Sequence, residues 1–301
     1  MSLPSTEPPG PPQPPGDPRS SWDLPAVGSL PTVTDLDDVV TRVLAPNPSP
    51  MTLDGTNTYV LGVSGSGEAV VVDPGPDDPG HLARVEEVLA ARDLEVRTIV
   101  LTHHHVDHAE AAERWADRFG AVVAANRRSL ACSSAAILRD GDRVELAGVD
   151  LEVVATPGHT RDHVSLRVGT GALLTGDHVL GRGTSVVAHP DGDLAAYLGS
   201  LRRVLDLGPD ALYPGHGPEL VEDPQAVLRF YAEHRRFREA QVLTALADHP
   251  ASPAELVARI YADVDRRLWP AAEASTRATL ALLETQARVR FDGDLAMRSD
   301  G

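Results

Sequence analysis

The sequence predicts an α/β (α+β) protein that carries a small helical domain at its C-terminal end. Between about residue 30 and residue 223, short apolar runs typical of strands are followed by amphipathic helical patterns, and this order occurs twice. From Pro224 onward the pattern becomes helical and ends in a stretch able to form a hairpin. A chain of 301 residues can bury a full core, so we expect one large domain and one smaller one.

The N-terminal 22 residues are predicted to lie outside the fold. Their proline-rich composition, MSLPSTEPPGPPQPPGDPRSSW, favours a disordered tail with polyproline-like segments. The segment lacks the basic start and apolar stretch of a secretory signal, and the chain has a single cysteine, Cys132, so we expect a cytoplasmic protein without a disulfide. We therefore divide the chain into a tail (1–22), a main domain (23–223) and a helical domain with a wing-like hairpin (224–301).

The first αβ half begins with strands. VVTRVLAPNPSPMTLDGTNTYVLGV and EAVVVDPGP predict strands that Pro, Asn and Gly turns interrupt. DPGHLARVEEVLAARD predicts an amphipathic helix, VRTIVLT a buried strand, and AEAAERWADRFG a second helix that ends at Gly120. The histidine-rich stretch LTHHHVDHAE, residues 101–110, is therefore expected on a loop between a strand and a helix.

The second half repeats this order. AVVAA, the hairpin DRVELAGVDLEVVATPG, DHVSLRVG and GALLTGD predict short strands that end at turn residues. DLAAYLGSLRRVLDLG predicts a helix, and ALYPGHG a last strand and turn. Three helical stretches follow Pro224, and ARVRFDGDLAMR predicts the terminal hairpin. We expect the two αβ halves to lie face to face.

Histidines and aspartates concentrate in turns that follow these predicted strands. Two histidines spaced by one residue, then an aspartate and another histidine, do not fit one helix face and indicate a turn. Imidazole and carboxylate groups together suit zinc, iron or manganese, so the sequence predicts a site for one or two cations. The candidate ligands, in chain order, are His103, His105, Asp107, His108, His159, Asp177 and His216.

The order HxHxDH, GH, GD and PGHG resembles the metallo-β-lactamase fold superfamily over residues of about 30 to 223. The resemblance implies a four-layer αββα sandwich with metals at the sheet edge. It also implies two Zn²⁺, with iron or manganese as alternatives. The ligand set that it implies is His103, His105 and His159 for one metal, Asp107, His108 and His216 for the other, and Asp177 as the bridge.

Within that superfamily, the chain is most similar to the beta-lactamase-like protein 2 subfamily. The stretches that carry this resemblance are GTNTY, TPGHTRDH, TGDHVLGRGT, YPGHGP and HRRFREAQVL, followed by a winged-helix-like C-terminal domain. The resemblance implies endoribonuclease activity on single-stranded RNA for the animal members. Related fungal members are thioesterases acting on carrier-bound polyketides, so the subfamily does not fix the substrate.

Two cations can supply a shared hydroxide as the nucleophile, so no serine or cysteine nucleophile is required. Asp107 is expected as a ligand, with proton acceptor as an alternative role. His163 is expected to orient a ligand or the substrate, and a buried structural role is the alternative. His104 is expected to point away from the metals, Asn57 to form a turn, and His178 to lie at the surface.

The charge distribution separates the substrate hypotheses. Residues 1–223 hold 16 arginines against 33 acidic residues, while 224–301 hold 11 of each, so the main domain repels a polyanion at long range. Glu110 is expected near the pocket rim, where it would oppose a phosphate. We therefore favour a small-molecule or carrier-bound ester, thioester or lactone over single-stranded RNA, and expect neither a membrane nor sequence-specific DNA as partner. A mononuclear iron sulfur dioxygenase and a non-enzymatic winged-helix binding protein are further alternatives.

Overall fold

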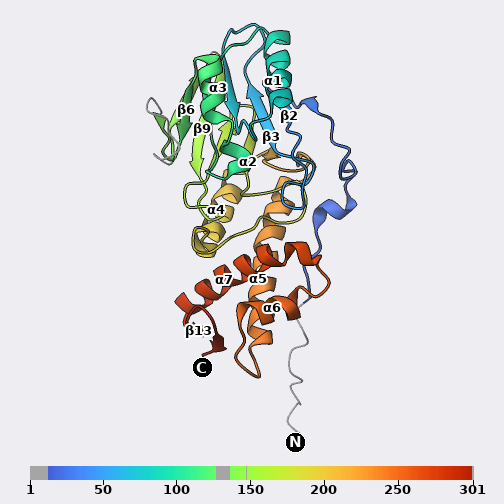
Figure 1. The fold of residues 1–301 in the computed structure, drawn as a ribbon, viewed down its shortest axis with the longest axis vertical. Coiled ribbons are helices and arrows are strands. Elements are labelled where there is room, and N and C mark those ends of the chain that lie inside the picture. The colour runs from blue at the N-terminus through green and yellow to red at the C-terminus, as the bar shows by residue number, and fades with distance from the viewer. Residues whose placement is uncertain (1–12, 127–135, 147, 300–301) are drawn as a thin grey trace, which may run out of the picture.

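The computed structural model describes residues 13–126, 136–146 and 148–299. Cys132 and residues 1–12 of the predicted tail lie outside these ranges. The described part of the chain contains a seven-stranded sheet, a five-stranded sheet and a C-terminal two-stranded ribbon (Figure 1). The strands of the first sheet, in spatial order, are β1 (Val33–Asp35), β2 (Val40–Leu44), β3 (Asn57–Leu61), β4 (Ala69–Val72), β5 (Val96–Val100), β6 (Val122–Ala125) and β7 (Ala136–Ile137). Those of the second sheet are β12 (Ala211–Pro214), β11 (Ala172–Gly176), β10 (Val164–Val168), β9 (Val149–Ala155) and β8 (Arg143–Leu146).

Helices cover the outer faces of both sheets and form most of the C-terminal part. Apolar side chains of α1 and α3 pack against the first sheet, and those of α4 and α5 pack against the second. The predicted four-layer αββα arrangement is confirmed. The helices are α1 (Pro79–Ala91), α2 (Val106–Ala109), α3 (Ala112–Phe119), α4 (Leu194–Leu207), α5 (Pro224–Ala245), α6 (Pro253–Ile260) and α7 (Trp269–Thr285), with 3-10 turns η1 (Pro18–Ser21) and η3 (Arg266–Leu268).

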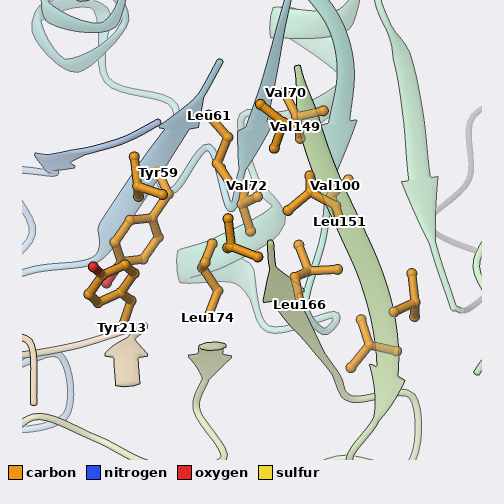
Figure 2. Packing of buried hydrophobic residues seen from close by; sticks show 14 of the residues in the cluster. Tyr59, Leu61, Val70, Val72, Val100, Val149, Leu151, Leu166, Leu174 and Tyr213 are labelled. Carbon is orange, nitrogen blue, oxygen red and sulfur yellow. The ribbon is translucent and has the colours of Figure 1, made fainter. Parts of the chain in front are cut away.

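The main core lies between the two sheets (Figure 2). β3 and β4 are buried along their whole length, which explains why β4 (AVVV) is apolar throughout and β3 (NTYVL) is apolar in its second half. Leu61 and Val72 face Leu151 and Leu174 across this core, and Tyr59 stacks against Tyr213 with ring centroids 6.1 Å apart. The inner faces of the sheets are thereby fixed against each other.

This packing brings several strand ends to one edge of the sandwich. β4, β5 and β6 are parallel neighbours in the first sheet, and β11 and β12 are parallel in the second. Because the carboxyl ends of parallel strands meet at the same edge, the loops after β4, β5, β11 and β12 lie together there. β9 ends at the same edge, since the amide of Thr156, the residue after this strand, donates to the His163 carbonyl beside that loop cluster.

The C-terminal helices have a core of their own. Leu246, Leu256, Leu280 and Val289 belong to a separate buried cluster, closed by the ribbon of β13 (Val289–Phe291) and β14 (Ala296–Arg298). The predicted terminal hairpin is confirmed. In the described part of the chain, no helix is both long and apolar enough to cross a membrane.

The end of the predicted tail is folded, which corrects the expectation of disorder up to residue 22. Residues Pro18–Ser21 form η1, and the Arg19 side chain is buried. Its guanidinium pairs with Asp17 at 2.7 Å, donates to the carbonyls of Leu180 and Gly183, and lies 5.5 Å from the Phe230 ring. These contacts anchor the chain locally although the preceding composition favours disorder.

Candidate metal centre

The loops at the sheet edge bring all seven predicted ligands into two adjacent groups. In each group the candidate donor atoms lie within 4.8 Å of one another. His103 and His105 come from the loop after β5, and α2 carries Asp107 and His108. The first group is His103, His105, His159 and Asp177, and the second is Asp107, His108 and His216.

The carboxylate of Asp177 lies between the two groups. Its Oδ2 is 3.6 Å from Nε2 of His159, while its Oδ1 is 3.4 Å from Nε2 of both His108 and His216. Asp107 contacts the histidines of its own group, with Oδ2 3.3 Å from Nε2 of His216 and 3.7 Å from Nε2 of His108. One oxygen of Asp177 therefore faces each group, as a bridging carboxylate would.

Hydrogen bonds from the other ring nitrogen fix the orientation of the histidines. Nδ1 of His159 lies against the Val186 carbonyl and Nδ1 of His216 lies 3.1 Å from the Gly55 carbonyl. Since a carbonyl oxygen only accepts, each Nδ1 carries a proton, which leaves Nε2 as the nitrogen that can bind a metal ion in the centre. Nδ1 of His108 is held in the same way, by the carboxylate of Asp73 at 2.9 Å.

Several ring nitrogens face one another across short distances. Nε2 of His108 and Nε2 of His216 are 3.2 Å apart, and Nε2 of His159 and Nδ1 of His105 are 3.0 Å apart. Nε2 of His103 is buried and has no hydrogen-bond partner among the described residues. Two ring nitrogens at these distances repel unless a proton or a metal ion lies between them, so the donor set fits bound metal ions.

The electrostatics of the site also favour a cation. Burial lowers the pKa of His216, but the charge of Asp177 and hydrogen bonds to Asp107 and Asp177 outweigh it and raise the pKa to about 9. Burial raises the pKa of Asp177, but the charges of His216 and His108 hold it well below its usual value. The carboxylate is therefore ionised and attracts positive charge to the point where the histidines converge.

Asp73, at the end of β4, orients this centre, and the sequence analysis missed it. Oδ2 accepts from Nδ1 of His108 at 2.9 Å and from the Thr102 hydroxyl at 2.7 Å, while Oδ1 accepts from the Thr102 amide at 2.8 Å. Because Thr102 donates to Asp73, its oxygen accepts from Nδ1 of His103 at 3.0 Å. The sequence does hold a signal for Asp73: in VVVDPG an aspartate follows a predicted strand, as Asp177 does in LTGD.

His163 contacts the centre through the backbone. Its Nε2 accepts from the Asp177 amide at 3.1 Å, and its Nδ1 lies 2.9 Å from the Thr156 hydroxyl. Burial lowers its pKa well below the usual value, so the ring is neutral. Its position is compatible with the expected orienting role and, because the ring is buried, also with the structural alternative, so its role stays a prediction.

The other polar residues singled out from the sequence have defined places. Asn57 is the first residue of β3 and does not form the expected turn. It is buried and donates to the carbonyls of Pro214 and Gly217, both at 2.8 Å, so it holds the loop that carries His216. His104 turns away from the centre to Asp162, at 2.8 Å. The expectation of a surface position for His178 is wrong, because its ring packs against Tyr197, fully buried.

A cavity of about 410 Å³ opens beside the centre. His159 and Asp177 form one end, and the far wall comes from the C-terminal helices, including Leu268 and Ala272. Glu110 does not line it, since its carboxylate accepts from the Asp77 amide at 3.2 Å. The expectation of Glu110 at the pocket rim is therefore not met, so Glu110 no longer argues against a phosphate in this cavity.

Comparison with known families agrees with the fold and the site. Residues 51–131 and 133–216 match the model of the metallo-beta-lactamase superfamily, a range that contains all seven candidate ligands. Residues 252–298 match the beta-lactamase associated winged helix domain, which corresponds to α6, α7 and the terminal ribbon.

Individual relatives cover most of the chain. It is 36% identical over 275 residues to a beta-lactamase-like protein 2 homolog from Drosophila melanogaster, covering 86% of this chain and 92% of that one. It is 34% identical over 263 residues to an atrochrysone carboxyl ACP thioesterase from Aspergillus fumigatus, covering 79% and 81%. A metallo-beta-lactamase family protein from Thermus thermophilus superimposes with a TM-score of 0.74 at 26% identity, covering 88% and 100%.

Proposed function

Because this chain belongs to the metallo-β-lactamase superfamily and is a metal-dependent hydrolase, we propose that it uses two zinc ions to hydrolyse an ester, thioester or lactone. The observation that carries the proposal is the position of Asp177, with one oxygen toward each group of histidines. A single-metal site would leave one of these groups without a role.

The seven clustered side chains would hold the metals, and the surrounding residues keep them in place. When bound, such cations polarise a carbonyl oxygen and lower the pKa of water toward about 7. Burial raises the pKa of Asp107, but its hydrogen bond to His216 and the charge of His108 bring it below the usual value. Asp107 is therefore a weak base at neutral pH, which favours its role as a ligand over that of proton acceptor.

The cavity supports an acyl substrate over RNA. Its volume lies within the range of about 300–1,000 Å³ usual for small-molecule sites. RNA bases would need exposed aromatic rings to stack on, but Phe230 and Tyr231, which lie among the arginines of α5, are buried against the main domain. The relative named as an acyl carrier protein thioesterase supports a carrier-bound substrate for this chain as well.

Parallel hydrolysis assays on acyl thioesters, a lactone and labelled single-stranded RNA test this proposal. We expect thioester or lactone turnover that a chelator abolishes and added Zn²⁺ restores. Asp177→Ala should lose activity, while Asp77→Ala, an exposed acid outside the two groups, should keep it. RNA cleavage without acyl hydrolysis, sensitive to the same variant, would overturn the substrate class.

A further inference from the structure

Three arginines line the cavity beside the metal centre. Arg182 lies in the loop after β11, and Arg235 and Arg238 lie one turn apart on α5. Much of the remaining wall is apolar and includes Leu180 and Leu268. The cavity therefore joins a reactive end, an apolar wall and a positively charged region.

These guanidinium groups lack acidic partners. Among the described residues no carboxylate lies within 4.0 Å of any of the three, although the protein has a net charge of -17. Nε and Nη2 of Arg182 and Nε of Arg235 and of Arg238 are buried without a hydrogen-bond acceptor. By contrast, the buried Arg42 pairs with Glu219 at 2.7 Å. Partly desolvated cations without partners are costly, which indicates a site that an incoming anion completes.

The three arginines differ in their freedom to move. Arg235 is fixed, since its Nη2 donates to the Ser185 carbonyl and its guanidinium lies 4.8 Å from the centre of the Tyr197 ring. Arg238 stacks on Tyr261 at 4.3 Å and, within the part of the chain that the structure describes, makes one side-chain hydrogen bond, to Gln241. Arg182 has no such contact among the described residues. Arg182 and Arg238 can therefore turn toward a ligand, while Arg235 holds a constant positive charge between the helix and the loop.

We propose that this cavity binds the carboxylate or phosphate of a small acyl substrate through Arg182 and Arg238, while the apolar wall packs against the body of that substrate. The inference rests on the proposed function, because the scissile ester or thioester would lie at His159 and Asp177. Guanidinium groups bind both anions through paired hydrogen bonds. A carboxylate would belong to the acyl part and a phosphate to the alcohol or thiol part.

Thioesters that carry the anion in the acyl part or in the thiol part test which part of the substrate the arginines bind. We would compare the neutral pentanoyl-N-acetylcysteamine with glutaryl-N-acetylcysteamine, and the neutral pentanoyl-pantetheine with its phosphate. The wild-type kcat/KM should be about tenfold or more higher for at least one anionic substrate than for its neutral partner, the contribution expected of one charged hydrogen bond. Arg182→Gln and Arg238→Gln should each lower this ratio, whereas Arg236→Gln, exposed on α5 and outside the cavity, should keep it. Equal ratios in the wild type and both cavity variants would overturn the inference and leave the hydrolase proposal standing.

A binding measurement tests the inference independently of turnover. Calorimetric titration of the metal-loaded full chain would compare octanoate and octyl phosphate with octanol. We expect an anionic probe to bind about tenfold more tightly than octanol, and this difference to shrink in both cavity variants but not in Arg236→Gln. Loss of thioester turnover with this pattern intact would count against the proposed function alone. Octanol binding as tightly as both anions, or anion binding unchanged by both cavity variants, would overturn the inference.

Discussion

Replacing Asp73 with asparagine tests how the metal centre is oriented. Both oxygens of Asp73 accept hydrogen bonds, from the amide and hydroxyl of Thr102 and from Nδ1 of His108, at 2.7 to 2.9 Å. The amide has nearly the same volume, but its NH₂ group must face one of these donors in either orientation. His108 can relieve the conflict by moving its proton to Nε2, which removes the lone pair that faces the centre.

We expect Asp73→Asn to weaken zinc binding about 10–100-fold, the usual cost of losing such a supporting carboxylate. This corresponds to about 1.4–2.7 kcal/mol of binding free energy. A competition titration against a chromophoric chelator measures the affinity. Asp77→Asn is the matched control, because Asp77 lies on the following loop and pairs with Arg114 at the surface.

Unchanged zinc affinity in a folded Asp73→Asn protein would refute the argument that Asp73 sets the proton position of His108. Thr102→Val provides a second test. It removes the hydroxyl that links Asp73 to His103 while leaving the carboxylate in place, so a smaller loss is expected. A larger loss than that of Asp73→Asn would assign the main supporting role to the hydroxyl.

Three further changes probe the surroundings of the site. Asn57→Ala removes the side-chain donor of the Gly217 carbonyl, while the Pro214 carbonyl keeps the Tyr59 hydroxyl as a donor. The change should cost roughly 1–3 kcal/mol of unfolding free energy in urea titrations, and a cost near zero would contradict its clamping role. A Cβ at Gly215 would lie 2.7 Å from Oδ1 of Asp177, so Gly215→Ala should lower the metal content of the protein. Gly199→Ala is the control, because a Cβ there would meet open space. Equal metal content in the two variants would contradict the close packing at Gly215. Burial lowers the pKa of His81 to about 4, so below a pH of about 6.5 the unfolded chain gains a proton that the folded chain does not. Stability should therefore fall by about 2 kcal/mol from this group between about pH 7 and pH 5, a loss absent from His81→Gln in urea titrations at the two pH values; identical pH dependence would refute it.

The sandwich follows from local sequence patterns. β3, β4 and β5 are apolar runs ended by turn residues, and α1 and α4 are amphipathic, so each element can be recognised by itself. The candidate ligands stand out because histidine and aspartate are unusual directly after buried strands. Their pattern also identifies the family, which supplies the pairing of the two sheets.

Contacts between distant segments were not predictable from those patterns. Asp73 and His108 are 35 positions apart, and only the parallel pairing of β4 and β5 brings them together. Arg19 reaches Leu180 across 161 positions, although its neighbours predict disorder. Arg182 and Arg238 line one cavity because α5 packs across the loop after β11. Local sequence patterns do not predict this contact.

The metal content of the protein, purified without added metal, tests the central claim most directly. Mass spectrometry of the intact chain and of its metals should give close to two zinc ions per chain, and Asp177→Asn should lower that number. One iron per chain, unchanged in Asp177→Asn, would contradict a binuclear centre bridged by Asp177.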